Sequence, residues 1–127
     1  MRRIRLLLCA IPLFAVSATV AERIPAALDP ALVAPHIFEV ALENEKVRVL
    51  EVTDRNGETQ PLHSHPSRLV IYMAPCAWLV TDARGEQSME SHKFGAMYWE
   101  LPVTHGGQTS TVVQECRTIE VEIKDPP

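Results

Sequence analysis

The 127-residue sequence has no apolar run long enough to cross a membrane as a helix. Its N-terminal apolar run, from Leu6 to Val16, is well short of the ~20 residues that such a helix needs. Three arginines precede this run and small residues follow it, a pattern typical of an export signal, here cleaved after Thr19-Val20-Ala21. An uncleaved anchor is the alternative. We therefore expect a signal peptide over residues 1–21 and an exported mature protein, periplasmic or secreted, without a stable membrane anchor.

Basic residues are scarce in the mature chain. Removing residues 1–21 leaves 9 Lys and Arg against 16 Asp and Glu, a net charge of −7. Because this charge repels phosphate backbones, nucleic acid is excluded as a partner. About 106 residues remain, which is enough for one domain with a single core, and the chain has no internal repeat and no low-complexity tract.

Cysteines are also few. Only Cys76 and Cys116 remain after the predicted cleavage, and an oxidising compartment would allow them to form a disulfide. Pairing depends on how close the fold brings them, which the sequence does not give. A disulfide and two buried thiols both stay open.

What the sequence does contain, from Ile37 onward, is a series of short runs rich in β-branched residues and separated by turn signals. The expected strands cover residues 37–42, 46–53, 68–73, 76–81, 96–101, 109–114 and 116–124. Residues 81–87 are expected to form a hairpin tip, with Gly85 at positive φ. Many short strands without a long helical period predict an all-β antiparallel sandwich or barrel.

Alternation within two of these strands predicts which side chains face the core. Ile119, Val121 and Ile123 alternate with charged residues and form an apolar face. In the expected strand 46–53, Val47, Val49 and Val52 are expected to face the core.

The segments that flank the strands differ in composition from them. Residues 22–36 contain three prolines and are expected to form an extended arm on the barrel or on a neighbouring subunit. Residues 125–127 are expected to form a frayed tail. The predicted domain therefore covers residues 37–124.

Three histidines form the main candidate site. His63 and His65 are two positions apart, so in a strand their imidazoles point to the same side and can bind one metal ion at about 2.1 Å. His105 follows a predicted strand and precedes two glycines, which allow close approach of the backbone. We therefore expect His105 to be the third ligand.

The sequence around these histidines resembles the cupin family. Gly57 is followed after five residues by His63-Ser64-His65, which resembles the first half of the cupin signature, and the segment from Gly95 through Pro102 to His105 resembles the second cupin motif. The closing sequence RTIEVEIK is similar to the last strand of small cupins. The resemblance covers residues 38–124 and implies a single cupin-type antiparallel jelly-roll β-barrel that pairs as a homodimer.

The sequence also departs from the cupin pattern. A glutamate ligand is expected four or five residues after the second histidine, but Leu69 and Val70 stand there. The resemblance then implies a site of three neutral imidazoles for a divalent transition metal, with Fe, Zn, Ni, Mn and Cu all suitable. Similar three-histidine cupins include Fe(II) dioxygenases. The alternative is a barrel that has lost its metal together with the glutamate.

Residues near the histidines are candidates for substrate binding and catalysis, each with a structural alternative. Arg68 is expected to hold a substrate carboxylate, unless it is simply solvated. Tyr72 is expected to donate a hydrogen bond to substrate or act as an acid, unless it only fills the core. Trp99, with Trp78 and Tyr98, is a candidate pocket wall. Glu100 is a candidate base, but neighbours in a strand face opposite ways, so Trp99 and Glu100 exclude each other.

Two histidines are expected at the surface, His36 in the proline-rich arm and His92 in a polar stretch. Neither is expected to bind metal.

Two classes of function follow from these residues. The first is an exported metalloenzyme of oxygenase or isomerase type that acts on a small anionic molecule; as an enzyme it would be a metal-dependent, dioxygenase-like cupin. The second is a non-catalytic periplasmic barrel that binds a ligand or a metal. A structural barrel whose sheet edges build a homodimer is compatible with either.

Overall fold

Short β-strands form most of the computed structural model, which describes residues 25–107 and 109–124. The strands are β1 (Phe38–Glu43), β2 (Val47–Asp54), β3 (His63–His65), β4 (Arg68–Tyr72), β5 (Cys76–Thr81), β6 (Gln87–His92), β7 (Met97–Glu100), β8 (Val103–His105), β9 (Ser110–Gln114) and β10 (Cys116–Ile123). The all-β prediction is confirmed.

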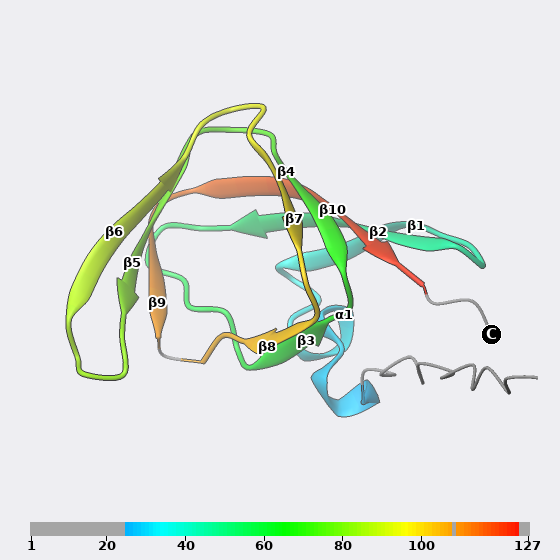
Figure 1. Cartoon of the computed structure of the whole chain (residues 1–127), viewed down its shortest axis with the longest axis horizontal. Coiled ribbons are helices and arrows are strands. Elements are labelled where there is room, and N and C mark those ends of the chain that lie inside the picture. Colours follow the sequence, from blue (N-terminus) through cyan, green and yellow to red (C-terminus); the bar gives the residue numbers. More distant parts are fainter. Residues whose placement is uncertain (1–24, 108, 125–127) are drawn as a thin grey trace, which may run out of the picture.

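The strands form three antiparallel sheets that curve around a common interior (Figure 1). The largest has the order β1-β2-β10-β4-β7, the second pairs β3 with β8, and the third has the order β6-β5-β9. Strands that are far apart in sequence therefore lie side by side, as β2 and β10 do. This arrangement is the double-layered jelly roll that the sequence predicts.

Three strands lie outside the expected strand ranges: β3, β6 and β8, although the spacing of the histidines and the expected hairpin tip pointed to the first two. Two of them have only three residues, and the third, β6, has the polar sequence QSMESH, so none has the apolar alternation that marks a strand. The hairpin between β5 and β6 was expected, and Gly85 at its tip has a φ of 82°.

The inner face of the largest sheet is polar along β10, whereas the sequence predicted an apolar inner face. On β10 the buried residues after Cys116 are Thr118, Glu120 and Glu122, whereas Ile119, Val121 and Ile123 lie on the outer side. The predicted orientation of this strand was therefore wrong. Alternation only shows that the two faces differ, and buried charged residues that have partners can occupy the inner face.

The neighbouring strand β2 has the same reversal. Leu50, Val52 and Asp54 are buried, so Val52 was placed correctly. Val47 and Val49 lie on the outer side, opposite Ile123 and Val121. The largest sheet thus has an apolar outer face as well as a buried inner one.

The N-terminal part of the described chain is helical rather than extended. Residues Ala26–Leu28 form a 3₁₀ turn, and Pro30–Val33 form the short helix α1. Asp29 caps this helix by accepting a hydrogen bond from the backbone N–H of Ala31 at 3.0 Å. Proline at the first helical position suits a helix start, which explains why a proline-rich segment is helical here.

Two small apolar clusters make up the core. One lies between the N-terminal segment and β1–β2 and contains Ala34, Ile37, Phe38, Leu50 and Val52. The other contains Val70, Tyr72 and a disulfide between Cys76 and Cys116. The disulfide joins β5 to β10 and so ties the three-stranded sheet to the largest sheet.

No helix among the described residues has the length and apolar character needed to cross a membrane. The predicted signal peptide, residues 1–21, and the predicted tail, residues 125–127, lie outside the described residues.

Candidate metal centre

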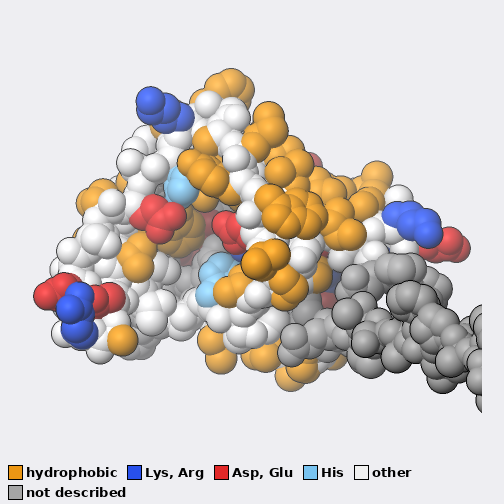
Figure 2. All heavy atoms as spheres, viewed as in Figure 1, with side chains coloured by type: hydrophobic (Ala, Val, Ile, Leu, Met, Phe, Trp, Pro, Cys, Tyr) orange, Lys and Arg blue, Asp and Glu red, His pale blue; other side chains and the backbone are white. Residues whose placement is uncertain are grey.

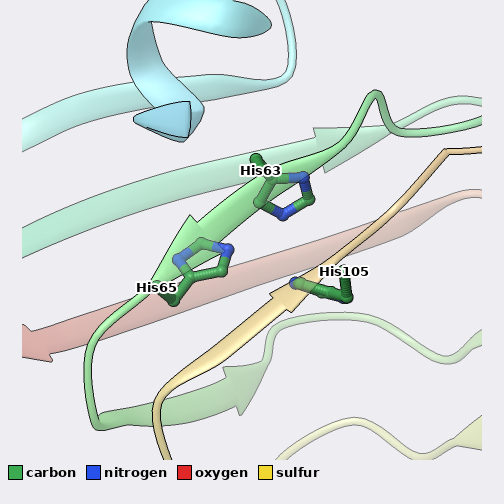
Figure 3. A group of neighbouring side chains, drawn as sticks. All are labelled: His63, His65 and His105. Atoms are coloured by element: carbon green, nitrogen blue, oxygen red, sulfur yellow. The ribbon is translucent and has the colours of Figure 1, made fainter. Parts of the chain in front are cut away.

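Three histidines converge inside the barrel from two paired strands. His63 and His65 come from β3, and His105 comes from β8, where it is the direct partner of His63 (Figure 3). The rings of His63 and His105 have centroids 4.4 Å apart. One nitrogen from each ring can be chosen so that all three lie within 4.8 Å of one another. The structure therefore brings together the three residues that the sequence proposed as ligands.

A glycine allows the two strands to approach each other at this point. Gly106 directly follows His105, has a φ of 94°, and lies against the backbone of Pro61. A Cβ at this position would collide with the carbonyl group of Pro61. The next residue, Gly107, donates its backbone N–H to the carbonyl of Gln60 at 2.8 Å. These contacts fix the position of His105 relative to His63.

Hydrogen bonds fix which nitrogen of two ligands is free. Nδ1 of His63 donates to the carbonyl oxygen of Pro61, and Nδ1 of His65 donates to the carboxylate of Glu122, both at 2.7 Å. Since both acceptors lack a proton to give, each Nδ1 carries the hydrogen and each Nε2 presents a lone pair. This arrangement is typical of histidines that bind a metal through Nε2.

The three Nε2 atoms are buried and have no hydrogen-bond partner among the described residues. Buried polar atoms are nearly always satisfied, and three such atoms in one place can share a single bound ion. Imidazole nitrogen is a good ligand for Zn, Fe, Ni, Mn or Cu. The residues present therefore fit a divalent transition metal.

Burial also keeps the three rings neutral. Desolvation lowers the pKa of His65 to about 2 and that of His105 to about 3, and the positive charge of Arg68 contributes in both cases. Burial lowers the pKa of His63 as well. Because only a neutral imidazole can bind a metal through its lone pair, the rings are in the form that binding requires.

A buried chain of charged residues connects His65 to the N-terminal helix. Glu122 accepts from His65 with one oxygen and from Nε of Arg48 with the other, at 2.6 Å. Arg48 in turn donates from Nη1 to Asp29 at 2.7 Å. Because Arg48 balances the charge of Glu122, this carboxylate orients the ring of His65 without stabilising its doubly protonated, cationic form.

Arg68 lies beside the histidines and is almost fully buried. Its Nε is 2.9 Å from Oε2 of Glu120, and its Nη2 is 2.7 Å from Oε2 of Glu100. The Nε–Oε2 approach lacks hydrogen-bond geometry, and Nη1 has no hydrogen-bond partner in the described part of the chain. Arg68 is thus not solvated, and it keeps donor capacity for another group.

Glu120 supplies a carboxylate in the interior from the strand β10, where the cupin pattern has no ligand. It lies on β10, one strand away from Val70, which faces inward where the cupin pattern has its glutamate. Desolvation raises the pKa of Glu120 to about 7, although Arg68 opposes the shift. Its distance from Nδ1 of His65 is 3.6 Å. The position where the glutamate ligand is expected therefore carries no carboxylate, but Glu120 supplies one elsewhere in the interior.

A cavity of about 320 Å³ opens beside the histidines. Its lining includes Asp54, Gln60, Arg68, Val70, Tyr72, Trp78, Glu90, His92, Glu100, His105 and Glu120. Figure 2 shows histidine and acidic side chains around a hollow on this face of the molecule. A volume of this size suits a small molecule.

Of three other proposed site residues, two line the cavity and one lies outside it. Tyr72 and Glu100 line the cavity, and burial raises the pKa of Tyr72, so its hydroxyl stays protonated. Trp99 does not line it: the side chain is 58% exposed and opposite Leu69 on the outer face. The predicted role of Trp99 in the wall was wrong, because Tyr98 and Glu100 take the inward positions of β7.

The two histidines expected at the surface differ. His36 is exposed, with 64% of its side chain accessible. His92 lines the cavity, and its side chain is only 11% exposed. The surface prediction for His92 was wrong because β6 was not recognised as a strand, and its inner face turns this ring toward Tyr72.

Sequence reasoning missed three acidic residues of the site: Asp54, Glu120 and Glu122. Glu120 and Glu122 lie on the predicted strand 116–124, on the face opposite the one expected to be apolar, and Asp54 directly follows the predicted strand 46–53. The only available signal was the even spacing of Thr118, Glu120 and Glu122 on the strand next to the histidines.

Comparison with known proteins gives a fold but no family assignment. No family model and no curated protein matches the chain. Among solved structures, a cupin domain from Bordetella pertussis Tohama I is similar with a TM-score of 0.56 and 24% identity, over 70% of this chain and 93% of that one. A cupin superfamily protein from Desulfitobacterium hafniense is similar with a TM-score of 0.50 and 7% identity, over 91% of this chain and 90% of that one.

A third similar structure is a conserved protein of unknown function from Streptococcus pyogenes. Its TM-score is 0.50 and its identity 14%, over 72% of this chain and 75% of that one. The described residues therefore form a small single domain with the cupin fold, and three histidines inside it are positioned to hold a metal ion.

Proposed function

We propose that the protein binds one divalent transition metal through His63, His65 and His105 and uses it to bind a small molecule in the adjacent cavity. The observation that carries this proposal is the set of three buried Nε2 atoms, which have no hydrogen-bond partner in the part of the chain that the structure describes. Three protein ligands leave coordination positions open, as catalytic metal sites do and structural sites do not.

We further propose that the site is enzymatic, of the oxygenase or isomerase type that three imidazole ligands suit. A bound metal would supply Lewis acidity, or oxygen activation in the case of iron. Arg68 has a free Nη1 to donate to an oxygen of the substrate. Tyr72 presents a protonated hydroxyl to the same cavity. These two groups would orient an oxygen-bearing substrate beside the histidines.

A non-catalytic ligand-binding or metal-binding barrel is the second candidate. It is favoured by the pairing of Arg68 with both Glu120 and Glu100, since residues held in mutual ion pairs stabilise a cavity without being free to move protons. Turnover distinguishes the candidates: a barrel that binds metal and ligand but converts no small molecule fits the second.

We also propose export and dimerisation. The disulfide between Cys76 and Cys116 supports export, because such bonds persist in oxidising compartments. The apolar outer face of the largest sheet supports a homodimer. N-terminal sequencing of the mature protein tests the first, with Glu22 as the expected first residue.

The test of the metal site is elemental mass spectrometry of purified protein. We expect about one equivalent of a transition metal in the wild type and in His36→Ala, which removes an exposed histidine. His65→Ala should lose the metal. Equal metal content in His65→Ala and the wild type, with both folded, would reject the assignment.

A further inference from the structure

The cavity beside the histidines contains more acidic than basic side chains. Arg68 is the one Lys or Arg among its described lining residues, whereas Asp54, Glu90, Glu100 and Glu120 are acidic. Glu100 and Glu120 are both paired with Arg68, so this arginine is already matched. Asp54 and Glu90 have no arginine or lysine partner in the cavity. An exclusively anionic ligand would meet repulsion away from the metal.

The end of the cavity away from His63, His65 and His105 has aromatic walls. The ring of His92 stacks on that of Tyr72, with centroids 4.1 Å apart and planes 15° from parallel. Tyr98 meets this pair edge-on, at 5.3 Å from His92. Trp78 lies on the adjacent strand β5 and also lines the cavity. Aromatic faces attract cations, most strongly when the site is shielded from water.

An acidic residue, Glu90, stands at the rim of this aromatic group, with 58% of its side chain exposed. Glu90 is the direct partner of Trp78, and His92 is the direct partner of Cys76, so all four lie on the inner face of the three-stranded sheet. Oε1 of Glu90 is 3.0 Å from Nε2 of His92. Nδ1 of His92 is buried and has no hydrogen-bond partner among the described residues. The carboxylates of Glu100, Glu90 and Glu120 all contribute to the raised pKa of Tyr72, after burial itself.

We propose that the part of the cavity formed by Tyr72, Trp78, Glu90 and His92 binds the ammonium group of a small molecule. This inference deepens the proposed function and rests on it only for the other end of the ligand. There an oxygen atom of the ligand would accept a hydrogen bond from Nη1 of Arg68 and bind the metal. The substrate class is then a compact zwitterion or amine with a metal-binding oxygen, rather than a simple anion.

Opposite charges at the two ends of the cavity give this class its selectivity. The histidine end gains positive charge when the metal binds, and Arg68 presents its Nη1 there as a hydrogen-bond donor. The aromatic end retains negative charge from Glu90. A ligand with matching charges is oriented in one direction, whereas a simple anion or a simple cation gains from one end only.

The test uses choline and 3,3-dimethylbutan-1-ol, which have the same shape but differ in charge. Binding of each is measured by calorimetry and by tryptophan fluorescence, on metal-free protein and on protein loaded with zinc. We expect choline to bind at least about 5-fold more tightly than the neutral alcohol in both forms. Glu90→Gln should remove most of this difference. Glu86→Gln is the matched control, since Glu86 lies in the exposed hairpin outside the cavity and should change nothing.

The outcomes separate this inference from the metal assignment. Equal affinity for the two probes in the metal-free form, or the same ratio in Glu90→Gln as in the wild type, would overturn the ammonium site. Failure to load zinc would instead overturn the metal assignment and leave the result with metal-free protein interpretable. Circular dichroism of Glu90→Gln checks that the variant is folded.

Discussion

Glu122 accepts the Nδ1 hydrogen of His65 at 2.7 Å, across 57 residues of sequence. This contact orients the imidazole so that its other nitrogen faces the two remaining histidines. The carboxylate lies on β10, not on the histidine strands, so the site depends on the pairing of β10 with β4 and β2.

We expect Glu122→Ala to weaken metal binding by about 10- to 100-fold, because such orienting partners typically contribute that much to affinity. Glu122→Gln keeps an oxygen acceptor for His65 and should lose less. Competition with a chromogenic chelator measures both affinities, and the visible spectrum of the Co(II) form reports whether the ligand geometry has changed.

The control for this prediction is Glu115→Ala, which removes an exposed carboxylate just before the same strand. It should bind metal as the wild type does. An unchanged affinity in folded Glu122→Ala would mean that β3 and β8 position His65 without help from Glu122.

Gly106→Ala tests whether close approach of the backbone positions His105. An added Cβ would collide with the carbonyl of Pro61, so β8 must shift away from β3. We expect a loss of metal affinity of at least about 10-fold, since a displaced ligand disrupts the site. Gly107→Ala is the matched control, because it has a similar positive φ of 78° but open space around it.

Both glycine variants lose about 1 kcal/mol or more through the positive φ, so stability alone does not distinguish them. Metal affinity does. Equal affinities in the two variants would show that the approach to Pro61 does not set the position of His105.

Most of the fold and the three histidines could be predicted from the sequence, because both depend on local patterns. Gly57 and the His63–His65 spacing marked one half of the site, and Gly106 with His105 marked the other. Runs of β-branched residues located β2, β5 and β10, whose observed ranges are Val47–Asp54, Cys76–Thr81 and Cys116–Ile123.

The orientation of β10 could not be predicted, because it depends on partners far away in sequence. Glu122 is buried because Arg48 and His65 satisfy it, and neither partner is visible from the strand itself. Trp99 was placed inside for the opposite reason: a large aromatic residue is usually buried, but here it lies on an outer sheet face.

Asp54 is a buried acid whose charge destabilises the fold. It is 2% exposed, and desolvation raises its pKa from 3.8 to about 6 even though Gln60 donates a hydrogen bond to it at 2.9 Å. Between these two pKa values the folded state binds more protons than the unfolded state, so stability falls as pH rises from about 4 to about 6. The loss is at most about 3 kcal/mol.

Asp54→Asn should remove this loss, because asparagine keeps an oxygen acceptor for Gln60 but carries no charge. We expect its free energy of unfolding to exceed that of the wild type at pH 7.5 and to equal it near pH 4. Urea titrations at a series of pH values, with a chelator present, measure the difference. Asp82→Asn, at an exposed turn, should show no gain at pH 7.5; a gain in both variants would point to general charge reduction instead.

The outer face of the largest sheet gives the last prediction. In register across three strands, Ile71 lies between Met97 and Ile119, and Leu69 lies between Trp99 and Val121. Met97 and Trp99 are 63% and 58% exposed. A contiguous apolar sheet face of this kind is unusual on a monomer and suits a second copy of the same face, related by two-fold symmetry.

We expect sedimentation equilibrium to give twice the mass of the mature chain for the wild type. Trp99→Lys combined with Met97→Lys should give the monomer, because burying two lysines against apolar side chains costs more than the interface returns. Leu32→Lys, an exposed apolar residue of α1 away from this face, should remain dimeric. Metal content should be unchanged in all three proteins, since the histidines lie on the opposite side of the sheet, within the barrel. A monomeric wild type would require another partner to cover the face, whereas a dimer that survives both lysines would place the interface elsewhere on the molecule.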